Sequence, residues 1–126
     1  APWFDTAEII EYHHNQKKDS PSGTAIATAE RMSSASNQWD EDPTINESIA
    51  GARGAELKGI PIHAVRMKGM VAHQEVIMGS IGQTLTIRHD SPDRESFMPG
   101  VLLAVRGVAS LPNGLTIGLE KLLGIE

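Results

Sequence analysis

Cysteine is absent from the 126 residues, which excludes disulfides, zinc–thiolate sites and thiol nucleophiles. Aromatic residues make up 4%, so the core must be built mostly from aliphatic side chains. Basic residues are outnumbered 11 to 16, and the net charge of -5 argues against a nucleic-acid or anionic-membrane partner. No apolar run approaches the roughly 20 residues of a membrane span, and no signal peptide opens the chain. These absences favour a cytoplasmic protein.

The residues that are present suit a globular domain with a single core. Hydrophobic residues make up 40% of the chain and charged residues 21%. A strand-like stretch, "FDTAEIIEYHH", follows almost at once after the first residues, without the loose polar residues that often precede a domain. This start indicates a piece of a longer chain.

The first helix has clear sequence signals. A polar loop, "NQKKDSP", ends at Pro21, and Ser22 is suited to cap a helix. An apolar stripe at helical spacing follows and consists of Ala25, Ile26, Ala29 and Met32. We therefore expect a helix over 22–36.

Three further strands are expected at 60–67, 71–78 and 83–90, after a long polar connection. Short turns that contain glycine separate them, which favours an antiparallel meander. Glu75 interrupts the apolar pattern of the second run, so we expect an arginine from the adjacent strand or another subunit beside it. A second long helix should follow "SPD", with a kink or a late start because of Pro99.

Together these elements predict an α+β fold with a mixed or antiparallel sheet of about four strands. Two main helices should cover one face of this sheet. Apolar residues occur on both faces of the strands, so we expect the other face to be used for oligomerisation. We assign residues 1–111 to a substrate-binding and oligomerisation domain, and residues 112–126 to a C-terminal tail.

The most informative stretch is the loop before the first helix. It gathers His13, His14 and Lys17 next to the helix start at Ser22-Gly23-Thr24. A helix N-terminus offers free backbone N–H groups to an anion, lysine adds a charge, and histidine can transfer a proton near neutral pH. This combination indicates anion binding with general acid catalysis. Each feature also has a structural interpretation: a plain helix cap, solvated lysines, and a histidine that packs.

The same window is similar to a known family. "AEIIEYHHNQKKDSPSGTA" resembles the signature of 4-hydroxy-tetrahydrodipicolinate reductases, also called dihydrodipicolinate reductases, of lysine and diaminopimelate biosynthesis. The family pattern, approximately E-x-x-E-x-H-H-x-x-K-x-D-x-P-S-G-T-A, is matched by Glu8, Glu11, His13, His14, Lys17, Asp19, Pro21, Ser22, Gly23, Thr24 and Ala25. The resemblance continues from "GIPIHAVRM" to the C-terminal "GLTIGLEKLLG".

The resemblance implies reduction of a cyclic dicarboxylate by NADPH or NADH. It implies that His13 is the general acid/base and Lys17 a second proton donor. The substrate carboxylates would be held by His14, Ser22, Gly23 and Thr24. It also implies a homotetramer in which the sheets meet.

One family feature is missing from the sequence. The family begins with a Rossmann domain, and this chain has no strand–Gly-x-Gly-x-x-Gly–helix unit. We therefore expect the cofactor to be bound mainly by a segment upstream of Ala1, and the 126 residues alone to be inactive. The C-terminal tail would return to that missing nucleotide-binding domain.

Two other functions are weighed against the reductase. One is a non-catalytic oligomerisation or dicarboxylate-binding module with the same fold, which would not need both His13 and Lys17. The other is a metal-dependent hydrolase, which is disfavoured because no carboxylate lies at ligand spacing from His13 or His14. His63, His73 and His89 are interpreted as structural.

Overall fold

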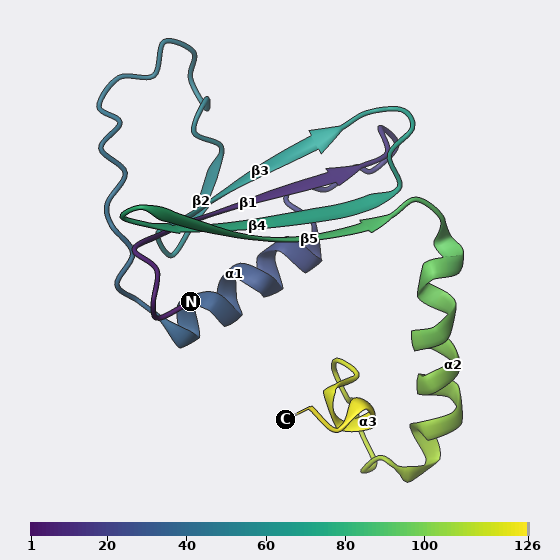
Figure 1. Cartoon of the computed structure of the whole chain (residues 1–126). Helices are drawn as coiled ribbons and strands as arrows, with labels where there is room; N and C mark the ends of the chain where they lie inside the picture. Colours follow the sequence, from purple (N-terminus) through teal and green to yellow (C-terminus); the bar gives the residue numbers. More distant parts are fainter. Residues whose placement is uncertain (126) are drawn as a thin grey trace. The chain divides into compact units, whose positions relative to one another are not determined.

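The computed structural model describes residues 1–125 and divides the chain into two compact units (Figure 1). The units are Ala1–Pro92 and Asp93–Glu126, and each is described by itself. The assignment of residues 1–111 to a substrate-binding and oligomerisation domain and of 112–126 to a tail stays a prediction. The return of the tail to a nucleotide-binding domain stays a prediction.

The first unit contains a five-stranded mixed sheet with the order β2-β3-β1-β4-β5. Its strands are β1 (Thr6–His13), β2 (Ala55–Leu57), β3 (Ile60–Arg66), β4 (Ala72–Ser80) and β5 (Gln83–Ser91). The α+β class is confirmed. The sheet has one strand more than expected, because the short β2 lies in the long connection and pairs with β3.

The expected meander is wrong at one position, because β3 and β4 are not neighbours. β1 lies between them, parallel to β3 and antiparallel to β4. Crossing one intervening strand requires roughly 10 Å, a distance that the connection between Arg66 and Ala72 can span. Because β1 is the central strand of the sheet, its residue Ile9 is fully buried.

Helix α1 (Gly23–Ala35) packs against one face of this sheet, as Figure 1 shows. The predicted cap is confirmed: Ser22 precedes the helix, and its hydroxyl oxygen accepts a hydrogen bond from the Ala25 N–H at 3.2 Å. The small buried residues Ala25 and Ala29 let the helix lie close to the strands. The core beneath it consists of Ala7, Ile9, Ala25, Ala29, Ile60, Ile62, Val76 and Met78. This side is called the helix-covered face below.

The opposite side, the open face, carries a charged network. Arg88 of β5 donates to Glu75 of β4 at 2.9 Å, which confirms the expected arginine partner from an adjacent strand. The Arg88 guanidinium also lies 5.5 Å from the centre of the Tyr12 ring. His73 is hydrogen-bonded to Asp90 at 2.7 Å, in agreement with its structural interpretation. The use of this face for oligomerisation stays a prediction.

The second unit is helical. It contains the short 3-10 helices η1 (Arg94–Phe97) and η2 (Val108–Ser110) and the α-helices α2 (Met98–Gly107) and α3 (Glu120–Leu123). Pro99 lies in the first turn of α2, so the predicted late start is confirmed. Leu122 packs against Gly107, where a larger side chain would collide with it. The side of the sheet on which α2 lies stays a prediction. No helix among the described residues has the length and apolar character of a membrane span.

Candidate functional site

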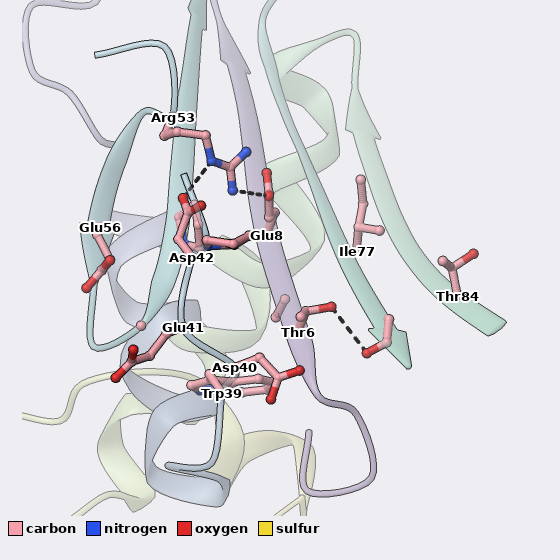
Figure 2. A pocket seen from close by; sticks show the side chains of 15 residues that line it. Thr6, Glu8, Trp39, Asp40, Glu41, Asp42, Arg53, Glu56, Ile77 and Thr84 are labelled. Carbon is pink, nitrogen blue, oxygen red and sulfur yellow. Dashed lines mark hydrogen bonds and ion pairs between the residues drawn. The ribbon is translucent and has the colours of Figure 1, made fainter. Parts of the chain in front are cut away.

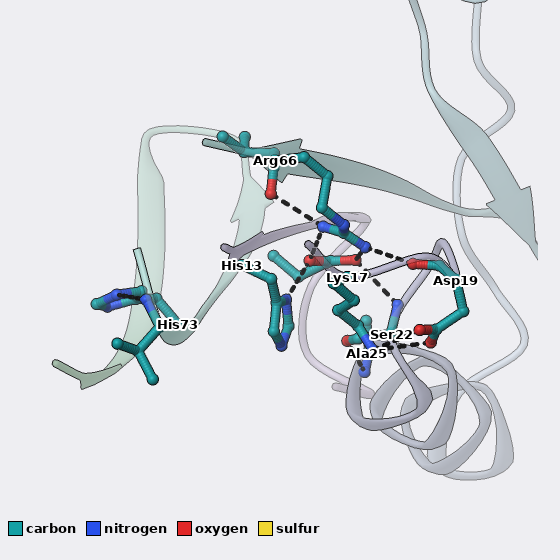
Figure 3. Close-up of polar contacts among 10 residues, drawn as sticks. His13, Lys17, Asp19, Ser22, Ala25, Arg66 and His73 are labelled. Carbon is teal, nitrogen blue, oxygen red and sulfur yellow. Dashed lines mark hydrogen bonds and ion pairs between the residues drawn. The ribbon is translucent and has the colours of Figure 1, made fainter. Parts of the chain in front are cut away.

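The candidate site lies where the end of β1 meets the start of α1. His13 is the last residue of β1, and Ser22 is the cap of α1. Figure 3 shows His13, Lys17 and Ser22 gathered here, together with Arg66 from the end of β3, whereas His73 lies apart. The loop between β1 and α1 therefore brings the predicted acid, the predicted second proton donor and the helix cap to one end of the sheet.

Glu11 is the centre of this arrangement, and its side chain is fully buried. One carboxylate oxygen accepts from the Ser22 N–H at 2.9 Å and from Arg66 at 2.8 Å. The other oxygen lies 2.6 Å from His13 Nδ1 and accepts from Arg66, also at 2.6 Å. Both oxygens are thus doubly hydrogen-bonded, as an ionised carboxylate requires when it is removed from water.

The pKa of Glu11 reflects two opposing effects. Burial raises the pKa of its carboxyl, but the hydrogen bonds from Arg66, His13 and the Ser22 N–H and the charge of Arg66 lower it more. The net result is a pKa below its ordinary value. The same pairing raises the pKa of Arg66. Glu11 and Arg66 therefore form a buried ion pair at neutral pH.

The hydrogen bond to Glu11 fixes how His13 presents its ring. A carboxylate accepts only, so Nδ1 must carry the proton that is shared with Glu11. In the described part of the chain, Nε2 of His13 makes no hydrogen bond. Because the side chain is 16% exposed, this nitrogen is the atom through which His13 can accept or donate a proton.

Lys17 is held beside this centre by Asp19. Its ammonium group donates to both carboxylate oxygens of Asp19 at 2.8 Å. Hydrogen bonding by Lys17 is the main cause that lowers the pKa of Asp19. Asp19 is 65% exposed, so an incoming anion can compete with it for the lysine. Arg66 also donates to the Asp19 carbonyl at 2.8 Å and so ties this loop to β3.

The start of α1 presents open backbone donors. Gly23 and Thr24 are exposed, and within residues 1–125 their N–H groups have no hydrogen-bond partner. A Cβ placed on Gly23 would meet no atom within 4 Å, so the space above this residue is free. The Ser22 N–H and hydroxyl oxygen are already used by Glu11 and Ala25, which leaves its O–H as a donor.

His14 is half-buried and follows β1 directly. Its carbonyl accepts from the Lys17 N–H at 3.2 Å, which closes the turn that carries the lysine. No side-chain hydrogen bond of His14 occurs in the described residues. Its expected contact with a substrate carboxylate stays a prediction.

A cavity of about 670 Å³ lies elsewhere in the first unit, and Figure 2 shows part of its lining. Arg53 lines it and donates to Glu8 and Asp42, both at 2.7 Å. A second cavity, of about 510 Å³, lies in the helical unit. None of the predicted site residues lines either of these two cavities.

Sequence reasoning did not assign a role to Glu11 or Arg66. A signal for Glu11 was present, because it shares a strand face with Ala7 and Ile9, where a charge must be paired. Arg66 could be found only from the parallel register that places it opposite His13. Sequence patterns do not reveal that register. In the structure, Arg66 forms an ion pair with Glu11.

Comparison with protein families identifies the chain. Residues 1–123 match the family model described as "Dihydrodipicolinate reductase, C-terminus". The chain belongs to this family. The expected resemblance is confirmed, and the match extends over nearly the whole length.

Similar proteins carry the corresponding name. Two curated relatives called 4-hydroxy-tetrahydrodipicolinate reductase, from Mycobacterium ulcerans and Thermobifida fusca, are 59% and 56% identical over 100% and 99% of this chain. The chain spans about half of their length, 51% and 52%. The solved structure of dipicolinate-bound dihydrodipicolinate reductase from Paenisporosarcina sp. TG-14 superposes with a TM-score of 0.80 at 45% identity. That match covers 94% of this chain and 45% of the other.

Proposed function

We propose that this chain is the substrate-binding half of a reductase that converts 4-hydroxy-tetrahydrodipicolinate to tetrahydrodipicolinate in lysine and diaminopimelate biosynthesis. The observation that carries the proposal is the open start of α1, which lies at the same end of the sheet as His13 and Lys17 (Figure 3). Backbone donors beside cationic side chains suit a small dicarboxylate. The solved relative that binds dipicolinate, a planar dicarboxylate, supports this ligand class.

Each residue has a defined task in this proposal. The N–H groups of Gly23 and Thr24 and the Ser22 hydroxyl hold carboxylate oxygens, and His14 contributes a further donor. His13 acts as general acid/base through Nε2, because Nδ1 is occupied by Glu11. Lys17 is a second proton donor that leaves Asp19 when the substrate dianion arrives.

The nicotinamide cofactor, NADPH or NADH, would supply the hydride in the whole protein. The chain contains no Gly-x-Gly-x-x-Gly turn, the usual pyrophosphate-binding element of a dinucleotide site. We place the main cofactor site in the half of the relatives that this chain does not span. The isolated chain is therefore expected to bind the dicarboxylate without reducing it.

Assembly and location complete the proposal. A homotetramer formed through the open face would cover the half-buried Ile10 and Ile77, which lie between charged neighbours. A biosynthetic enzyme of this kind would act in the cytoplasm. The homotetramer is inferred from the family and from the exposure of the sheet, and the location is inferred from the family.

The experiment joins the chain to the nucleotide-binding half of the Mycobacterium ulcerans relative and follows NADPH and NADH oxidation with substrate. We expect turnover, and a loss of about 100-fold or more in kcat for His13→Gln, because general acid–base catalysis contributes that much. Unchanged rates for this variant would remove His13 as the acid. Dicarboxylate binding without any turnover of the joined protein would favour the non-catalytic module instead.

A further inference from the structure

We propose that Glu11 is a positioning residue for His13: held ionised by Arg66, it fixes the imidazole with the proton on Nδ1 and so turns Nε2 toward the substrate. This inference rests on the proposed function for its chemical meaning. The part that concerns structure, namely which nitrogen of His13 carries the proton, can be tested without the proposed function.

The contacts support a fixed orientation. Glu11 is fully buried and makes all four of its hydrogen bonds at 2.6–2.9 Å. Its partners come from three places: His13 on the same strand, Arg66 at the end of β3, and the Ser22 N–H at the start of α1. A carboxylate restrained from three sides cannot follow the ring if the ring turns. The ring therefore keeps the orientation that the carboxylate selects.

Arg66 keeps Glu11 ionised, so that Glu11 accepts a hydrogen bond from His13 and cannot donate one. A buried carboxyl without a cation would take up a proton and could then donate, which would leave the His13 tautomer undetermined. The two bonds from Arg66 favour the ionised form, and the pKa of Glu11 is lowered accordingly. The remaining bonds of Arg66 go to the carbonyls of Val65 and Asp19, so the same cation anchors the loop that carries Lys17.

A second carboxylate of the chain also pairs with a histidine and an arginine, but it lies away from the candidate site, so it can serve as a control. On the open face, Glu8 bonds to His63 and to Arg53, both at 2.7 Å. There the histidine uses Nε2 rather than Nδ1. Glu8 and Glu11 thus lie three residues apart on one strand, and each pairs with a histidine and an arginine, but they should select opposite tautomers.

The test is a measurement of imidazole ¹⁵N chemical shifts in the 126-residue chain at about pH 9, where histidines of ordinary pKa are neutral. We expect His13 to be protonated on Nδ1 and His63 on Nε2. In Glu11→Gln, the Nδ1–H form of His13 should fall from the major to a minor population while His63 is unchanged. In Glu8→Gln, the effect should be the reverse, with His63 altered and His13 unchanged.

A wild-type His13 protonated mainly on Nε2 would overturn the inference without any variant, so it stays testable if Glu11→Gln does not fold. An unchanged tautomer in a folded Glu11→Gln would also overturn it, because a merely structural Glu11 would not control the ring. Neither result bears on dicarboxylate binding, which is measured separately. Failure of the inference and failure of the proposed function are therefore distinguishable.

Discussion

At the scale of single residues, losing one partner of the Glu11–Arg66 ion pair should cost more stability than losing an exposed carboxylate. Glu11 is fully buried, and removing one partner of a buried pair leaves the other charge uncompensated. We expect Glu11→Gln to lower the free energy of unfolding by about 3 kcal/mol. Glu8→Gln, at a carboxylate that is 36% exposed, should cost about 1 kcal/mol or less. Urea unfolding of both variants measures the difference, and equal losses would contradict it.

Glu11 should also make the free energy of unfolding depend on pH. Its pKa is lowered from an ordinary 4.5 in the folded chain, so the unfolded state binds more protons in acid. The stability that Glu11 contributes is complete above about pH 4.5 and is lost as the pH falls through the lowered value. The gap in unfolding free energy between wild type and Glu11→Gln should therefore shrink between about pH 7 and about pH 3. A constant gap would show that Glu11 is not ionised in the folded protein.

Gly23 offers a substitution that separates binding from folding. The space around it is empty, so Gly23→Ala should fold normally and be as stable as wild type or slightly more stable. The added methyl group would stand where a carboxylate must approach the open N–H groups. We expect dicarboxylate affinity to fall at least 10-fold while the unfolding free energy is kept, as calorimetry and urea unfolding can show. Undiminished affinity would mean that the ligand binds elsewhere.

At the scale of elements, the cap of α1 has a measurable value. Ser22→Ala removes the hydroxyl that accepts from the Ala25 N–H, which should cost about 1 kcal/mol. Ser34→Ala is the control: its hydroxyl donates to the Glu30 carbonyl within the same helix, and alanine is the better helix former. The control should be neutral or slightly stabilising. A loss as large in Ser34→Ala would show that the effect does not come from capping.

Elements were predicted better than their arrangement. Local signals placed α1, its cap at Ser22 and the late start at Pro99, because each depends on residues that are neighbours in the sequence. The insertion of β1 between β3 and β4 was missed, since pairing of distant strands leaves no local mark. The position of Arg66 beside Glu11 depends on that insertion. The residues of the proposed site could thus be named from the sequence, whereas the ion pair of Glu11 and Arg66 behind His13 could not.

At the scale of the whole molecule, the proposed assembly uses the open face. A homotetramer would have four times the chain mass of 13.6 kDa, which light scattering can measure. Ile77→Asp on the open face should reduce this mass, because a carboxylate would be buried without a partner. Ile87→Asp is the comparison on the helix-covered face, where Ile87 lies opposite Val76 and is 57% exposed. Loss of assembly in Ile87→Asp alone would place the interface on the other face.

The most direct test of the account is an NMR titration of the ¹⁵N-labelled chain with pyridine-2,6-dicarboxylate. We predict saturable shifts of the Gly23 and Thr24 amide signals and of the His13 and Lys17 side-chain signals. Pyridine-2-carboxylate, which has a single anionic group, should bind more weakly. Unshifted signals at these four residues with millimolar ligand would contradict the claim that the start of α1 binds a dicarboxylate.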